Sequence, residues 1–209
     1  PERYESVVNT PLSACLMTGY IASTLMSSHH DVTVVDANLY EWSFNKTVQE
    51  LQKKSFKLLG VHLVYLWEYT SDIFEALSSL KSKIPDIHIN LYGHFPTFAF
   101  KDLLTEHPFI DSITIGEPEG TFLELADAVV NNRGNSVLCT IDGLSFNASN
   151  SKEDGTVMKD VIVRNRPRKP DSNLDNLPSP FRNDYELKKK KGISTYILAS
   201  RGCYGKCTF

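Results

Sequence analysis

The chain has 209 residues, enough for one complete domain and part of a second. Hydrophobic residues make up 41% and charged residues 22%, which is ordinary for a globular protein, and the formal net charge of −3 gives no reason to expect nucleic acid or an anionic membrane as a partner. The apolar stretches are too short for a membrane-spanning helix, and four cysteines do not make a disulfide framework, which favours a reducing cytoplasm.

Helical and strand patterns alternate through the first two thirds of the chain. Apolar residues at helical spacing predict helices at 12–28, 45–57 (with Asn45 as N-cap), 71–83, 100–106 and 121–131. Short apolar or β-branched runs predict strands at 32–35, 58–65, 87–92 and 110–115. This alternation predicts a doubly wound α/β domain of the flavodoxin or Rossmann type, with a parallel sheet covered by helices on both faces.

One strand is missing from this pattern. A doubly wound sheet begins with a strand before its first helix, usually at the centre of the sheet. Only residues 4–8 are available for it. We expect the central strand to lie upstream of Pro1, with a stub at residues 6–8 as the alternative, and we assign residues 1–136 to the α/β domain.

The pattern changes after this domain. Stretches rich in β-formers at 137–147 and 156–164 predict a hairpin, and the proline-rich sequence after it predicts an extended linker, so that residues 137–187 connect two domains. Residues 188–209 begin with a run of lysines, which we interpret as a solvated loop. A predicted strand at 193–199 then starts the second domain.

Ligands of a doubly wound sheet bind at the carboxyl ends of its strands. The predicted strand ends are Asp36, 65–67, 93–96 and 116–119. Several of them have glycine or polar residues, as the rim of a ligand site would.

Two cysteines near the end of the chain form a second candidate site. Cys203 and Cys207 are spaced C-x3-C, with Gly202 and Gly205 around them. Iron–sulfur clusters need thiolates close in sequence, and glycines let backbone amides approach the sulfides. A zinc site and two ordinary cysteines are the alternatives, but the sequence has no second Cys/His pair at zinc-finger spacing.

The pattern S-R-G-C-x3-C-x-F at residues 200–209 resembles the cluster loop of the radical S-adenosylmethionine (SAM) superfamily. The resemblance implies a [4Fe–4S] cluster with Cys203 and Cys207 as ligands, SAM at the open iron, and an electron donor such as flavodoxin or ferredoxin. The third cysteine of the C-x3-C-x2-C motif would fall directly after Phe209. We therefore expect the chain to be the front part of a longer enzyme and to be inactive by itself.

The sequence upstream resembles the cobalamin-binding branch of the same superfamily. Residues 92–97, Y-G-H-F-P-T, are similar to its G-G-x-H-P-T loop, and residues 109–119 are similar to its F-V-D…G-E-G-E segment. Residues 11–38 look like its opening β/α unit and residues 174–180 like its L-D-x-L-P-x-P linker. The resemblance implies a cobalamin at the strand ends, with its nucleotide tail in the α/β domain, and a partial TIM barrel that begins at residue 188.

The resemblance also implies which residues contact the cobalamin. The candidates are Asn38, Tyr65, Trp67, Gly93, His94, Pro96, Thr97, Gly116, Glu117 and Glu119. For both glutamates the alternative role is a charge at a helix N-terminus, and for His94 it is loop packing. The remaining histidines are interpreted as structural: His29, His30, His62, His88 and His107. The other two cysteines, Cys15 and Cys139, lie in apolar segments and are interpreted as small core residues.

The sequence departs from the family pattern at several positions. Tyr92 and Pro118 replace glycines. Asn38 stands where cobalamin domains that ligate cobalt have the histidine of D-x-H-x-x-G, and Glu41 stands where they have its glycine. We therefore expect base-off cobalamin without a histidine ligand, its lower face open or met by residues 65–67.

The activity implied by the resemblance is methyl transfer. A 5′-deoxyadenosyl radical would abstract hydrogen from an unactivated carbon of a small molecule, peptide or natural product, and methylcobalamin would deliver the methyl group. One alternative is a radical SAM cyclase or rearrangement enzyme, with or without functional cobalamin. The other is a non-enzymatic corrinoid-binding module.

Overall fold

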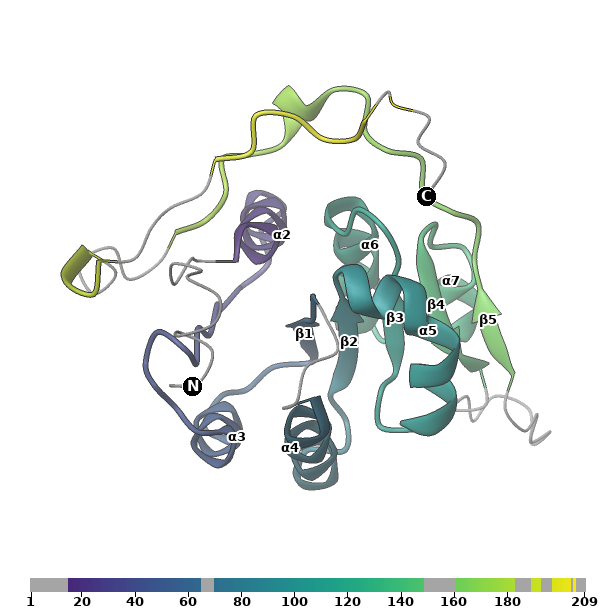
Figure 1. Ribbon diagram of the computed structural model, residues 1–209. Helices are drawn as coiled ribbons and strands as arrows, with labels where there is room; N and C mark the ends of the chain where they lie inside the picture. Colours follow the sequence, from purple (N-terminus) through teal and green to yellow (C-terminus); the bar gives the residue numbers. More distant parts are fainter. Residues whose placement is uncertain are drawn as a thin grey trace.

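The computed structural model describes residues 15–64, 70–148, 161–182, 189–192, 197–203 and 205. At its centre lies a five-stranded sheet in the order β1-β2-β3-β4-β5 (Figure 1). The strands are β1 (Leu58–His62), β2 (His88–Tyr92), β3 (Ser112–Thr114), β4 (Leu144–Asn147) and β5 (Ile162–Arg164). β1, β2 and β3 are parallel, and the predicted hairpin, β4 and β5, extends the same sheet by antiparallel pairing. The predicted α/β class with a parallel sheet is confirmed.

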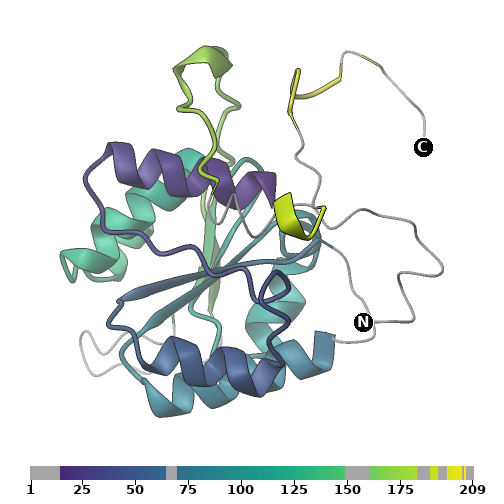
Figure 2. The same cartoon turned by 90° about the vertical axis from the view of Figure 1, so that its left-hand side faces the viewer.

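Helices cover both faces of this sheet (Figure 1 and Figure 2). They are α2 (Leu16–Ser27), α3 (Phe44–Gln52), α4 (Thr70–Lys83), α5 (His94–Glu106), α6 (Glu119–Val130) and the short α7 (Asn135–Leu138), and a 3-10 turn, η2, spans Leu174–Asn176. On one face α3, α4 and α5 enclose a cluster that includes Leu80 and Leu104. On the other, α2 and α6 enclose Leu25 and Phe122. None of the described helices is long and apolar enough to cross a membrane.

Strand β2 shows how one segment serves both faces. Side chains alternate along a strand, so Ile89 joins one apolar cluster while Tyr92 joins the other. The fully buried Asn90 donates to Ser112 Oγ (2.8 Å) and accepts from Thr114 Oγ1 (3.1 Å) in β3. This polar residue is tolerated in the interior because both ends of its amide have partners.

Several helix starts differ from the predicted ones, among them those of α3 and α5. The N-cap of α3 is Ser43, whose Oγ accepts from the Lys46 amide at 3.2 Å, and not Asn45. Helix α5 begins at His94, earlier than predicted, because Pro96 lies in its first turn, where a missing amide hydrogen costs no helical bond.

Some predicted strands are also wrong. Residues 32–35 form no strand, since a strand requires a neighbour to pair with and the described sheet ends at β1. Residues 197–199 likewise form no strand, and Ile197 is 87% exposed, while 193–196 and the expected stub at 6–8 lie outside the described residues. Of the predicted strand 137–147, the first part is α7 and only the end is β4.

Candidate functional site

The two glycine motifs meet at the carboxyl edge of the parallel strands. Gly93 follows β2, and Thr97 lies in the first turn of α5; Gly116 follows β3. The hydroxyl oxygen of Thr97 accepts a hydrogen bond from the Gly116 amide at 3.1 Å. A Cβ on Gly116 would meet no atom within 4 Å, so open space lies beside it. We call Gly93, Thr97 and Gly116 the rim.

Gly93 turns the chain from β2 into α5. Its φ of 114° is one that other residues rarely adopt, and a Cβ there would overlap the carbonyl oxygen of Leu63, at the end of β1. Pro96 is buried in the first turn of α5, while His94 is exposed beside it. Of the predicted residues in this motif, His94 is thus accessible from solvent, whereas Pro96 packs inside the domain.

Glu119, the first residue of α6, is almost fully buried, with 5% of its surface exposed. It accepts two hydrogen bonds from Arg201, from Nη2 to Oε1 (2.5 Å) and from Nη1 to Oε2 (3.1 Å). The same guanidinium lies 3.6 Å from a carboxylate oxygen of Glu117 and 5.1 Å from the ring centroid of Tyr20 in α2. The hydrogen bond to Glu119 raises the pKa of Arg201 above its usual value. Both glutamates predicted as cobalamin contacts therefore bind an arginine of the cysteine loop in this structure.

A cluster that the sequence did not reveal lies under the N-terminus of α2. His62 ends β1, and its Nδ1 lies 3.1 Å from Cys15 Sγ. Burial, and next the charge of His94, lower the pKa of His62 to about 4, so its imidazole is neutral near pH 7. Cys15 is exposed at the N-cap of α2, as Cys139 is after α7, so the prediction that both are core residues is wrong. His62 escaped notice because the strand was predicted to continue to residue 65.

Tyr92, which replaces a glycine of the family pattern, fills the space between α2 and α6. Its hydroxyl lies 2.7 Å from Thr18 Oγ1, and its ring meets Phe122 edge-on at 5.7 Å between centroids. Burial raises the pKa of Tyr92 well above its usual value. The tyrosine is therefore a packing residue of the α2–α6 face.

Asn38 is exposed in the turn that follows residues 32–35. The Asp36 carboxylate accepts from the Leu39 amide at 3.0 Å, and Glu41 has a φ of 56°, the left-handed region that favours glycine. Lys191 donates to the Leu39 carbonyl and to Glu41, both at 2.7 Å. Lys191 is exposed, as the interpretation of the lysine run as a solvated loop predicts, and it also holds this turn.

The described part of the cysteine loop shows one of the two predicted cluster ligands. Cys203 is exposed, and its sulfur accepts from the Gly205 amide at 3.3 Å. Gly202 has a φ of 83° that turns the chain before it. Cys207, Tyr65 and Trp67 lie outside the described residues. Among the residues that the structure describes, no three Cys, His, Asp or Glu side chains are close enough to hold a metal ion.

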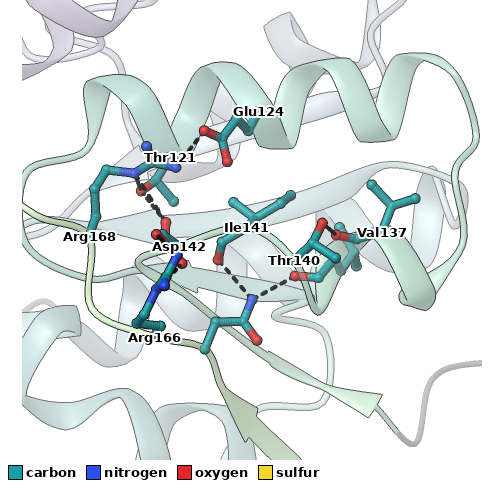
Figure 3. A network of polar contacts seen from close by, with 10 residues as sticks. Thr121, Glu124, Val137, Thr140, Ile141, Asp142, Arg166 and Arg168 are labelled. Carbon is teal, nitrogen blue, oxygen red and sulfur yellow. Dashed lines mark hydrogen bonds and ion pairs between the residues drawn. The ribbon is translucent and has the colours of Figure 1, made fainter.

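The linker begins beside the first turns of α6 (Figure 3). Arg168 Nε donates to Thr121 Oγ1 (2.7 Å) and to the carbonyl of Asp142 (3.2 Å), and its Nη2 lies 2.7 Å from a carboxylate oxygen of Glu124. Arg166 donates twice to the Asp142 carboxylate, at 2.9 and 3.1 Å. These contacts secure the chain where it leaves β5.

The L-P-S-P part of the linker then crosses α2 (Figure 2). The Phe181 amide donates to the Gly19 carbonyl at 2.9 Å, and Ser23 Oγ donates to the Ser179 carbonyl at 2.6 Å. A Cβ on Gly19 would lie 2.8 Å from the Phe181 carbonyl oxygen, so the glycine permits this close approach. The segment predicted as an extended linker is therefore docked on the α/β domain.

The fold and the rim define an α/β domain of the class whose ligands bind at the ends of parallel strands. No family model matches the chain. It is 28% identical over 194 residues to an uncharacterized methyltransferase of Pyrococcus horikoshii, covering 91% of this chain and 39% of that protein. It is 26% identical over 203 residues to the anaerobic magnesium-protoporphyrin IX monomethyl ester cyclase of Synechocystis sp., covering 90% of this chain and 36% of that protein. The chain thus spans less than two-fifths of the length of these relatives.

Two solved structures have the same fold. The fold matches that of the cobalamin-dependent S-adenosylmethionine radical enzyme OxsB, determined with aqua-cobalamin and S-adenosylmethionine bound, with a TM-score of 0.76 and 21% identity over 96% of this chain and 26% of that one. The apo form of OxsB matches with a TM-score of 0.65 and 20% identity, over 91% and 24% of the two chains. The chain thus shares its fold with a cobalamin-dependent S-adenosylmethionine radical enzyme, which agrees with the predicted resemblance.

Proposed function

We propose that this chain provides the cobalamin-binding region of a radical SAM enzyme and begins the loop that holds its iron–sulfur cluster. The observation that supports this most directly is the hydrogen bond between Thr97 and Gly116, since it joins two family motifs at the carboxyl edge of the sheet. The relatedness to OxsB and to the methyltransferase and cyclase supports the same class.

The residues at the carboxyl edge fit a large planar cofactor better than a small polar ligand. Gly116 has no side chain to obstruct its approach, and open space lies beside it. Asn38 and His94 are exposed and can hydrogen-bond to a cofactor amide. Bound cobalamin would supply a transferable methyl group, and SAM at the cluster would supply a hydrogen-abstracting radical.

The protein's own groups have defined tasks in this proposal. The Gly205 amide donates to the sulfur of Cys203, as backbone amides do in cluster loops. His62 stays neutral near pH 7, so it adds no cationic charge to the edge. Asn38 cannot coordinate cobalt as an imidazole does, which agrees with base-off binding without a histidine ligand.

We propose methyl transfer to an unactivated carbon as the activity of the intact protein, with a small molecule, peptide or natural product as substrate. We further propose that the intact protein works in the cytoplasm and receives its electron from a donor such as flavodoxin or ferredoxin. Ring formation is the second candidate, because the cyclase is nearly as similar to this chain as the methyltransferase, at 26% against 28% identity.

Cobalamin retention tests the proposal. The purified chain is incubated with hydroxocobalamin and desalted, and its visible spectrum is recorded. We expect about one corrin per chain, with the band shift of the base-off form. A spectrum without corrin after desalting would contradict the cobalamin assignment. In the intact protein, movement of a labelled methyl group from SAM to the bound corrinoid supports methyl transfer, whereas 5′-deoxyadenosine release without label movement supports the cyclase.

A further inference from the structure

Glu119 and Arg201 join two segments that are far apart in the sequence, the start of α6 and the loop with Cys203. The guanidinium makes a two-point contact with the carboxylate, and its third contact is with the ring of Tyr20. Two parallel N–H···O bonds restrict the orientation of the arginine as well as its position. The stacked aromatic ring adds to this restriction.

The pair is also poorly accessible to water and salt. The Arg201 side chain is 15% exposed and that of Glu119 is 5% exposed. Glu119 lies at the N-terminus of α6, where the helix dipole favours a negative charge. Loss of Arg201 would leave Glu119 as a nearly buried, unpaired charge, which is far more costly than loss of an exposed pair.

Because Arg201 is close to Cys203 in the sequence, its contact with Glu119 also restricts the position of that cysteine. Cys203 is two residues away, and two residues of extended chain span at most about 7 Å. The preceding residues, 197–200, are exposed and have no regular secondary structure. Within the described part of this loop, the arginine is therefore the residue that determines where the first cysteine lies.

We propose that Arg201 is a positioning residue: its pair with Glu119 holds the first cysteine of the cluster loop near the carboxyl edge of the sheet, and thereby sets the separation between the two cofactor sites. The identity of the two cofactors rests on the proposed function, whereas the tether itself does not. Glu119 and Glu117 thus serve the cysteine loop, and the rim serves the cobalamin.

A distance measurement without any cofactor tests the tether. Spin labels are placed at Cys203 and at position 98 (Phe98→Cys), an 85% exposed site in α5 next to Thr97, after replacement of Cys15, Cys139 and Cys207 by serine. Double electron–electron resonance then gives the distribution of distances between the labels. We expect one narrow distribution in this background and a broad one after Arg201→Gln or Glu119→Gln.

Two variants serve as controls. Glu117→Gln removes only the longer, 3.6 Å contact and should broaden the distribution least. Arg166→Gln removes an equally charged but 81% exposed arginine that pairs with Asp142, and should leave the distribution unchanged. Arg201→Gln leaves Glu119 nearly buried and unpaired, so its urea midpoint should fall, and the width of the distance distribution is the readout of the tether.

The outcomes separate a positioning role from a merely structural one. A narrow distribution that persists in Arg201→Gln, or a broad one already present in the background, overturns the proposal. A lower urea midpoint with an unchanged distance distribution also overturns it, because the pair would then stabilise α6 without positioning Cys203. If Glu119→Gln does not fold, Arg201→Gln decides alone. Failure of cobalamin retention would leave this result untouched, because no cofactor is present.

Discussion

Gly93 and Leu63 meet where β2 and β1 end, so closely that a Cβ on Gly93 would overlap the carbonyl oxygen of Leu63. The contact is possible only because Gly93 has a φ of 114° and no side chain. It fixes the direction in which α5 leaves the sheet and therefore the position of Thr97 at the rim. A similar positive φ, 79°, occurs at Gly116, but there in open space.

These two glycines give a matched pair of substitutions. Gly93→Ala should lower the free energy of unfolding by about 3 kcal/mol or more, since the strained backbone and the overlap with Leu63 add together. Gly116→Ala should cost only about 1 kcal/mol, the cost of the left-handed conformation alone. Urea unfolding measures both. Equal losses would show that the close approach between β1 and β2 is absent.

Thr97→Val tests the bond that joins the two rim motifs. The substitution keeps the shape of the side chain but leaves the Gly116 amide without its acceptor, a loss of about 1 kcal/mol. We expect weaker cobalamin retention after desalting, together with a urea midpoint lowered in proportion to this loss. Thr105→Val, in the same helix, removes only a bond to the Lys101 carbonyl and is the control. Equal cobalamin retention by both variants would show that the bond between Thr97 and Gly116 does not contribute to cofactor binding.

His88 makes stability depend on pH. Burial lowers the pKa of His88 to about 4, against 6.5 for the unperturbed group, so between these values the unfolded chain binds a proton that the folded chain does not. Its contribution is therefore complete above pH 6.5 and is lost as the pH falls towards 4, by roughly 3 kcal/mol in all. His88→Gln should reduce the slope of the unfolding free energy against pH near pH 5 by the amount that corresponds to about one bound proton. An unchanged slope would show that His88 is accessible to water.

Gly19→Ala should weaken the structure around α2, whereas the same substitution usually stabilises a helix. Alanine in a helix interior normally stabilises by about 1 kcal/mol, but here its Cβ would lie 2.8 Å from the Phe181 carbonyl oxygen. We expect α2 to remain folded and the linker to detach, so that the Phe181 amide loses its protection from hydrogen exchange. Ser23→Ala should have the same effect in part, because it removes the bond to Ser179. Ser82→Ala, which removes a bond within α4, is the control, and equal exchange in all three variants would contradict the docking.

Much of the fold could be predicted because it depends on local patterns. The apolar spacing of α4 and of β2 predicted both elements to within a residue or two. Pro96 misled the prediction of α5, because a proline signals a loop unless the helix begins immediately before it. Residues 32–35 have the composition of a strand, but composition does not provide a neighbour to pair with.

The sequence by itself determined the order of the elements, the two glycine motifs and the cysteine spacing, since each depends on residues close together in the chain. Only the tertiary structure decided what those residues contact. Glu119 and Arg201 are 82 positions apart, and Cys15 and His62 are 47 apart. Such contacts depend on how the chain packs in three dimensions, which no local pattern specifies. Glu117 and Glu119, which the sequence predicts as cofactor contacts, lie against Arg201 in the tertiary structure.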